Sequence, residues 1–425
     1  MKKILSSSLV LGVLFGIAAV GAVGLASTDV QAAENTNKVD VFVSFDKTPG
    51  AAEANLVRAF GGTVKYSYSI TPAVAASIPE AAIKGLLNNP HVTAVEMDGQ
   101  VQAAGTELDY AWGMAKIGAD TVQANGYTGA GVKIGIIDSG VNYNHSDLVA
   151  NFDPANRGYD FVQNDNDPMD VYGHGTHVAG TACAKGNGFG VIGVAPDCSL
   201  YSLRVLNDDG VGSWSATIAA MQWAVDNDMK VVNLSLGSSQ DPGTAVKTAF
   251  DNAEAHGIVI VAAAGNSGKP AGKGDNIIYP AKYASVIAVG ATVNDSNDTR
   301  ASFSSTGSTL ELMAPGESVL STWNDDTSYL NPQPICLDNG TSCYYKYGSG
   351  TSMASPHVAG AATLLIGAGV TDNKEVRSIL DSTATDKGVT GKDTLYGYGL
   401  VNVAAAIASL TPPSPAVNVN VSTDK

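Results

Sequence analysis

Three short glycine-rich motifs contain the residue types that could do nucleophilic chemistry. They are IIDSG, GHGTHVAG and GTSMASPH, at residues 136–140, 173–180 and 350–357. Asp138 ends an apolar run, His174 lies between two glycines, and Ser352 opens a segment of helical character. A serine hydroxyl needs a neutral imidazole to accept its proton, and that imidazole needs a carboxylate to fix its tautomer. The motifs therefore supply the three groups of a catalytic triad.

Simpler interpretations of these residues exist when each is taken alone. Asp138 could cap a turn, and Ser352 could be a helix N-cap. A lipase-type Gly-x-Ser-x-Gly elbow is not met, because Ala354 occupies the fifth position. His177 follows His174 without the His-Glu-x-x-His pattern of zinc proteases, so we expect it to be structural. The order Asp, His, Ser, each in a glycine-rich setting, favours catalysis.

Together the three motifs resemble the signatures of the subtilisins, and the resemblance covers about residues 35 to 408. It implies that Asp138 orients the imidazole, that His174 is general base and then general acid, and that Ser352 attacks the carbonyl. In the AAAGN segment, Asn266 resembles the asparagine that donates to the tetrahedral oxyanion. The expected activity is that of a serine endopeptidase.

The same resemblance implies a substrate cleft with two walls. One wall would pair with an extended substrate as an edge strand, which gives affinity with little sequence preference. The expected wall residues are Gly210, Val211, Gly212 and Trp214 on one side and Ser235, Leu236 and Gly237 on the other. Ile278 stands where typical subtilisins have a glycine before Tyr-Pro, so we expect a shallower primary pocket for small or medium apolar side chains. Ordinary loop packing is the alternative.

A Ca²⁺ site is also implied by the resemblance. Calcium takes six to eight oxygen ligands. The expected ligands are the side chains of Asp147 and Asn187 and the carbonyl oxygens of Lys185, Phe189 and Val191. Leu108 falls near the place of the family's N-terminal glutamine ligand, between Glu107 and Asp109, and one ligand position is therefore left open.

Apolar runs alternate with helical segments through residues 105–408, the expected catalytic domain. Buried strands are predicted at Val132–Ile137, Leu200–Val205, Val231–Leu234 and Ile258–Ala263, and helices at Ser213–Asn227 and Thr244–His256. Near-continuous apolar strands are typical of a parallel sheet that is covered on both faces. We therefore expect a three-layer α/β fold, with Ser213 as a helix cap and the active site at the carboxyl ends of the strands.

A smaller α+β unit is predicted at residues 33–104. Its signals are a strand at Val39–Phe45, a helix with Ala52, Leu56 and Phe60 on one face, and a strand at Val92–Val95. This unit resembles the ferredoxin-like propeptide of subtilisins. The resemblance implies a segment that assists folding and inhibits the enzyme until it is cut near Ala103–Gly105, which we expect to be autocatalytic.

Both ends of the chain have simple compositions. Residues 1–32 combine Lys2 and Lys3 with a long apolar run and a Val-Gln-Ala exit, which predicts a cleaved secretory signal; a permanent membrane anchor is the alternative. We expect an extracellular protein without a stable anchor. Residues 409–425 place three prolines among polar residues, which predicts a flexible tail.

Charge and cysteines limit the partners and the compartment. The formal net charge of −16 argues against nucleic-acid binding, and we expect a monomer that acts on proteins and peptides. The four cysteines allow three pairings; we favour Cys183–Cys198 and Cys336–Cys343 because they close short loops. Four buried thiols are the alternative.

Two other function classes remain open. An inactive binding protein of this fold would usually lose one of the four catalytic positions, and all four are present. An esterase could use the same triad, because acyl transfer to water is the shared reaction. The edge-strand segment and the propeptide favour peptide substrates.

Overall fold

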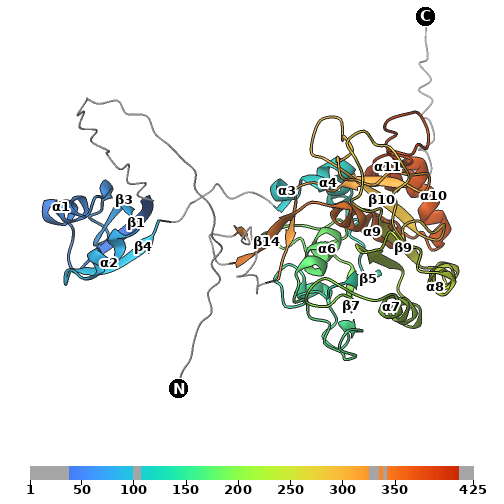
Figure 1. The fold of residues 1–425 in the computed structure, drawn as a ribbon, viewed down its shortest axis with the longest axis horizontal. Coiled ribbons are helices and arrows are strands. Elements are labelled where there is room, and N and C mark those ends of the chain that lie inside the picture. Colours follow the sequence, from blue (N-terminus) through green and yellow to red (C-terminus); the bar gives the residue numbers. More distant parts are fainter. Residues whose placement is uncertain (1–37, 99–106, 325–334, 338–341, 411–425) are drawn as a thin grey trace, which may run out of the picture. The chain divides into compact units, whose positions relative to one another are not determined.

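The computed structural model describes residues 38–98, 107–324, 335–337 and 342–410. The chain divides into two compact units, Met1–Gln102 and Ala103–Lys425, which are described separately (Figure 1). The predicted signal peptide, the predicted propeptide junction and the tail from residue 411 lie outside the described residues.

The first unit has a βαββαβ element order. Its elements are β1 (Lys38–Phe45), α1 (Ala51–Ala59), β2 (Thr63–Ser67), β3 (Ala73–Pro79), α2 (Ala82–Leu87) and β4 (Val92–Met97). The strands form an antiparallel sheet in the order β2-β3-β1-β4, as in ferredoxin-like folds. Alternate residues of β1, including Val41 and Val43, enter the core, because successive side chains of a strand point to opposite faces.

The predicted inner face of α1 was wrong at one position. Ala52 is exposed, whereas Glu53, Ala54 and Val57 are buried. Glu53 tolerates burial because its carboxylate accepts a hydrogen bond from Gly50 N at 2.8 Å. Glu53 is held by this capping bond, while Ala54 and Val57 provide the buried face of α1.

The second unit is built on a seven-stranded sheet. Its strands are β5 (Lys133–Asp138), β6 (Gly158–Asp160), β7 (Ser199–Arg204), β8 (Val231–Leu234), β9 (Val259–Ala263), β10 (Ile287–Thr292) and β11 (Leu312–Pro315). They pair in parallel in the order β11-β10-β9-β8-β5-β7-β6. The four predicted strands are confirmed, with ends displaced by at most one residue.

Helices cover both faces of this sheet (Figure 1). The helices of this unit are α3 (Glu107–Tyr110), α4 (Trp112–Ile117), α5 (Ala119–Ala124), α6 (His174–Cys183), α7 (Trp214–Asp226), α8 (Thr244–Ala255), α9 (Thr351–Gly367), α10 (Asn373–Thr383) and α11 (Val403–Ala408). Ile136 packs in one core with α6 and α9, and its neighbour Ile137 packs in the other with α7 and α8. The three-layer α/β prediction is confirmed. Ser213 caps α7 by accepting from Ala216 N at 3.2 Å.

A small antiparallel sheet precedes α9. It contains β12 (Val319–Thr322), β13 (Ile335–Leu337) and β14 (Ser342–Gly348), in the order β12-β14-β13. Cys336 and Cys343 lie in the paired strands β13 and β14, but their side chains are outside the described residues, and their disulfide stays a prediction.

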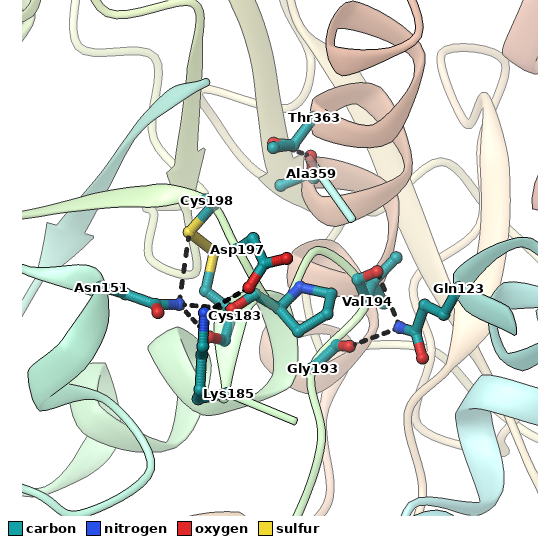
Figure 2. Close-up of a disulfide and its surroundings, with 11 residues drawn as sticks. Gln123, Asn151, Cys183, Lys185, Gly193, Val194, Asp197, Cys198, Ala359 and Thr363 are labelled. Atoms are coloured by element: carbon teal, nitrogen blue, oxygen red, sulfur yellow. Dashed lines mark hydrogen bonds and ion pairs between the residues drawn. A yellow bond between two sulfur atoms is a disulfide. The ribbon is translucent and has the colours of Figure 1, made fainter. Parts of the chain in front are cut away.

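The disulfide between Cys183 and Cys198 is present, as predicted (Figure 2). It joins the last residue of α6 to the residue before β7, with Cα atoms 6.1 Å apart. Asn151 Nδ2 donates to Cys183 O at 2.6 Å and to Pro196 O at 3.0 Å. The disulfide therefore fixes the C-terminal end of α6, whose first residue is His174.

Among the described residues, no helix has the length and apolar character needed to cross a bilayer.

Candidate active site

Asp138 and His174 form a hydrogen-bonded pair at the carboxyl edge of the sheet. Asp138 is the last residue of β5 and is fully buried. Its Oδ1 lies 2.7 Å from His174 Nδ1 and accepts from Ser139 N at 2.8 Å. His174 is the first residue of α6, after Gly173, whose φ of +97° suits glycine. The carboxylate therefore fixes the ring and leaves Nε2 for chemistry.

The surroundings of His174 favour its protonated form. Burial alone lowers its pKa, but the charge and the hydrogen bond of Asp138, together with the charge of Asp170, outweigh burial. The pKa of His174 therefore lies above its ordinary value. His177 differs, because burial lowers its pKa to about 3. The His177 Nε2 lies 3.0 Å from Val319 O and Lys346 O, as expected for a structural histidine.

Ser352 lies in the first turn of α9, where helix N–H groups lack partners within the helix. Its Oγ donates to Ser235 O at 3.1 Å, and Ser235 Oγ donates to Ser352 O at 2.7 Å. Ser235 and His174 line the same pocket. In the described part of the chain the Ser352 hydroxyl bonds to Ser235 rather than to His174. Nucleophile–base hydrogen bonds are often long or misaligned until substrate binds.

Asn266 presents an amide donor next to Ser352. It follows β9 after Gly265, and its Oδ1 accepts from Thr351 N at 2.9 Å and from Thr351 Oγ1 at 3.0 Å. Both bonds use Oδ1, so Nδ2 is turned away from Thr351. A Cβ on Gly350 would lie 3.3 Å from Asn266 Nδ2 and 3.6 Å from Ser352 N. Because Gly350 has no side chain, a small space remains next to two N–H donors, Asn266 Nδ2 and Ser352 N.

A pocket of about 420 Å³ extends from His174 between the two predicted walls. All seven predicted wall residues line it, namely Gly210, Val211, Gly212, Trp214, Ser235, Leu236 and Gly237. Leu206 and Gly212 form a β-bridge that closes the turn carrying the first wall, in which Gly210 N donates to Asn207 O at 2.9 Å. Tyr172, which the sequence analysis missed, lines the pocket and stands over Gly210. It belongs to a polar loop with no catalytic motif of its own.

Ile278 fills the space behind the second wall. A Cβ on Gly237 would lie 2.8 Å from Ile278 Cδ1, and a Cβ on Gly265 would lie 2.9 Å from Ile278 Cγ2. Its N–H donates to Ala264 O at 3.0 Å, which sets its register against β9. The side chain therefore packs against both glycines, but Ile278 is not among the described residues that line the pocket.

The predicted calcium ligands lie in one loop region. Asp147 is fully buried. Its Oδ2 accepts from Val191 N at 3.1 Å, and its Oδ1 lies 3.3 Å from Asn187 Nδ2. The ammonium of Lys185 pairs with Asp197 (Figure 2), and Phe189 N donates to Asn187 Oδ1 at 3.3 Å. Among the described residues, no cluster has three or more His, Cys, Asp or Glu side chains with metal-binding geometry.

Glu107 adds a second carboxylate to this loop. It accepts from Asn187 N at 2.8 Å and from Gly188 N at 3.1 Å. The pKa of Asp147 is raised to about 6, because burial and the charge of Glu107 together outweigh the hydrogen bonds that lower it. These hydrogen bonds come from uncharged donors, so Ca²⁺ would balance the two carboxylates. The donor set fits that ion, and Glu107, to which the sequence analysis assigned no role, contacts the same loop.

Comparisons with known proteins agree with this geometry. A family model described as the subtilase family matches residues 129–399. Subtilisin J of Geobacillus stearothermophilus is 40% identical over 408 residues, which cover 94% of this chain and 99% of that protein. Subtilisin DY of Bacillus licheniformis is 49% identical over 296 residues, which cover 69% and 97%. The chain belongs to the subtilase family and is a serine endopeptidase.

Proposed function

We propose that this endopeptidase cleaves peptide bonds through an acyl-enzyme on Ser352. His174 Nε2 takes the hydroxyl proton as Ser352 Oγ attacks the carbonyl carbon, and then gives that proton to the leaving amine. Water then hydrolyses the acyl-enzyme: His174 takes a proton from the attacking water and returns it to Ser352 Oγ. The observation that carries the proposal is the 2.7 Å hydrogen bond between buried Asp138 and His174 Nδ1. His174 lines the same pocket as Ser235, the residue to which Ser352 is hydrogen-bonded.

The tetrahedral oxyanion would lie between Asn266 Nδ2 and Ser352 N. Fixed donors stabilise the charge that develops there, and they need no reorganisation during the reaction. The space that Gly350 leaves open beside both nitrogens supports this assignment.

The pocket supports broad cleavage of extended protein chains. An exposed wall at Gly210–Gly212 offers backbone groups to a substrate strand, whatever its side chains. Because Ile278 packs against both Gly237 and Gly265, we expect its side chain to shorten the primary pocket. We expect small or medium apolar side chains before the cut bond.

Calcium would stabilise the folded enzyme at the loop of Asp147 and Asn187. The carbonyls of Lys185, Phe189 and Val191 would complete the oxygen cage, and Glu107 would contribute charge. The ion would supply no chemistry to peptide cleavage; its role there is to hold the loop.

The N-terminal segments fit a secreted zymogen. We infer that residues 1–32 direct export and are removed, and that residues 33–104 inhibit the enzyme as a separate folded unit until it cuts them. The mature protein would then be an extracellular monomer that acts on proteins and peptides.

Casein hydrolysis tests the proposal. The purified mature protein should release peptides from casein, and a phosphonyl reagent that reacts with activated serines should stop the release. Ser352→Ala, matured by adding active wild-type enzyme, should be inactive after that enzyme is removed. Hydrolysis by purified Ser352→Ala at the wild-type rate would refute the assigned nucleophile.

A further inference from the structure

A buried carboxylate outside the triad binds both chain segments that carry Asp138 and His174. Asp170 belongs to the turn before α6 and is 4% exposed. Its Oδ1 accepts from Ser139 Oγ at 2.9 Å and from Gly173 N at 2.8 Å. Its Oδ2 accepts from Thr176 N at 2.9 Å and from Thr176 Oγ1 at 2.6 Å.

These bonds connect the end of β5 to the start of α6. Ser139 directly follows Asp138, while Gly173 and Thr176 flank His174 in the chain. Ser139 Oγ also accepts from Gly175 N at 2.9 Å, so one hydroxyl connects Asp170 with the first turn of α6. A shift of Asp170 would therefore move both partners of the Asp138–His174 bond.

Close backbone packing makes this arrangement rigid. Gly140 has φ +102°, and a Cβ there would lie 2.8 Å from both Pro168 O and Met169 O. The turn after Asp138 thus lies directly on the turn that carries Asp170. Behind that turn, Asn324 Nδ2 donates to Val171 O at 2.8 Å.

We propose that Asp170 is a positioning residue for the reaction: its carboxylate holds the Asp138–His174 pair in register, and its negative charge stabilises the imidazolium. This proposal rests on the triad proposed above. The four donors to Asp170 are uncharged, so its charge is not neutralised by a bonded cation.

The charge acts on His174 in a defined direction. Asp138 and Asp170 both raise the pKa of His174, against the effect of burial. The remaining histidine of α6, His177, is neutral at the working pH, because burial lowers its pKa to about 3. Burial raises the pKa of Asp170 itself to about 6, so the carboxylate is charged at neutral pH.

The test compares three variants of the mature enzyme by their kcat, KM and pH profiles. Asp170→Asn should lower kcat about 10-fold with KM unchanged, because small displacements of catalytic groups slow the reaction strongly. It should also move the acid limb of kcat/KM to lower pH, because a negative charge near His174 is lost. Ser139→Ala keeps the charge of Asp170 but removes the hydroxyl that connects Asp170 with Gly175 N. For this variant kcat should fall, while the acid limb of kcat/KM should stay at the same pH. Asp165→Asn makes the same charge change at an exposed position of the loop, and it should alter neither kcat nor the pH of the acid limb.

Each outcome decides the proposal. A folded Asp170→Asn enzyme with wild-type kcat, or with lower kcat and an unmoved acid limb, would overturn it. If Asp170→Asn does not fold, Ser139→Ala decides, and a wild-type kcat for that variant counts against positioning. Ser352→Ala in the same assay separates the two levels of argument. Activity that survives it refutes the proposed nucleophile, whereas Ser352-dependent activity insensitive to Asp170 and Ser139 refutes only this inference.

Discussion

His174 Nδ1 lies 2.7 Å from the buried Oδ1 of Asp138, although the two residues are 36 positions apart in the chain. The pairing requires β5 to end where α6 begins, and the parallel sheet provides that meeting point at its carboxyl edge. A fully buried carboxylate holds its partner without competition from water, so the pair is electrostatically strong. The predictions below follow from this arrangement and from the residues around it.

The activity should depend on pH through His174. Only the neutral imidazole accepts a proton, and this form is lost as pH falls through its pKa. Because the pKa of His174 is raised, the acid limb of kcat/KM should have its midpoint above the ordinary value of 6.5. Initial rates on a neutral peptide substrate measure this directly. A midpoint at or below 6.5 would show that Asp138 does not outweigh burial.

Asn266→Ala should lower kcat by about 10²–10³ while KM changes little, because the lost donor acts on the oxyanion rather than on bound substrate. Ser267→Ala is the matched control, since Ser267 is the next residue and is also exposed. Thermal unfolding of both variants shows whether losing the bonds to Thr351 has loosened α9. Equal kcat values for the two variants would remove Asn266 from the mechanism.

Ile278→Gly should deepen the primary pocket, since its side chain packs against both Gly237 and Gly265. We expect kcat/KM for phenylalanine before the cut bond, relative to alanine, to rise at least about 10-fold. A peptide library with one varied position gives the ratio. Ile277→Val changes the neighbouring core residue and should leave it unaltered. A wild-type enzyme that already prefers large aromatic side chains would contradict the shallow pocket.

Removal of calcium should destabilise the mature enzyme. At a calcium concentration 100-fold above Kd, binding contributes about 2.7 kcal/mol, which corresponds to a Tm shift of roughly 4 °C in a protein of this size. Calorimetry with and without a chelator measures the shift. Asp147→Asn should lose most of this response, because it removes the buried carboxylate of the site. An unchanged Tm in chelator would argue that the loop holds no ion.

Strands and helices of the catalytic unit could be predicted because their signals are local. The apolar run of β8 matches its predicted bounds, and Ser213 caps α7 through its own side chain. The candidates Asp138, His174 and Ser352 could be named because each stands in a distinctive motif, and the structure joins the first two by a hydrogen bond. Such features can be predicted because the residues that create them are close together in the chain.

Features that depend on distant partners could not be recognised in the same way. Asp170 ends a polar stretch that resembles a solvated loop, and only the fold buries it against Ser139. Glu107 meets the loop of Asn187 across 80 residues of sequence. Ala52 was wrongly predicted because the helix turns Ala54 and Val57 toward the core instead.

Covalent labelling tests the central claim most directly. The mature enzyme is treated with a serine-reactive phosphonyl reagent, digested and sequenced by mass spectrometry, alongside His174→Ala as control. A single adduct on Ser352, lost in His174→Ala, is the predicted result, because the hydroxyl is nucleophilic only while an imidazole accepts its proton. An adduct on another serine, or equal labelling of Ser352 without His174, would contradict the account.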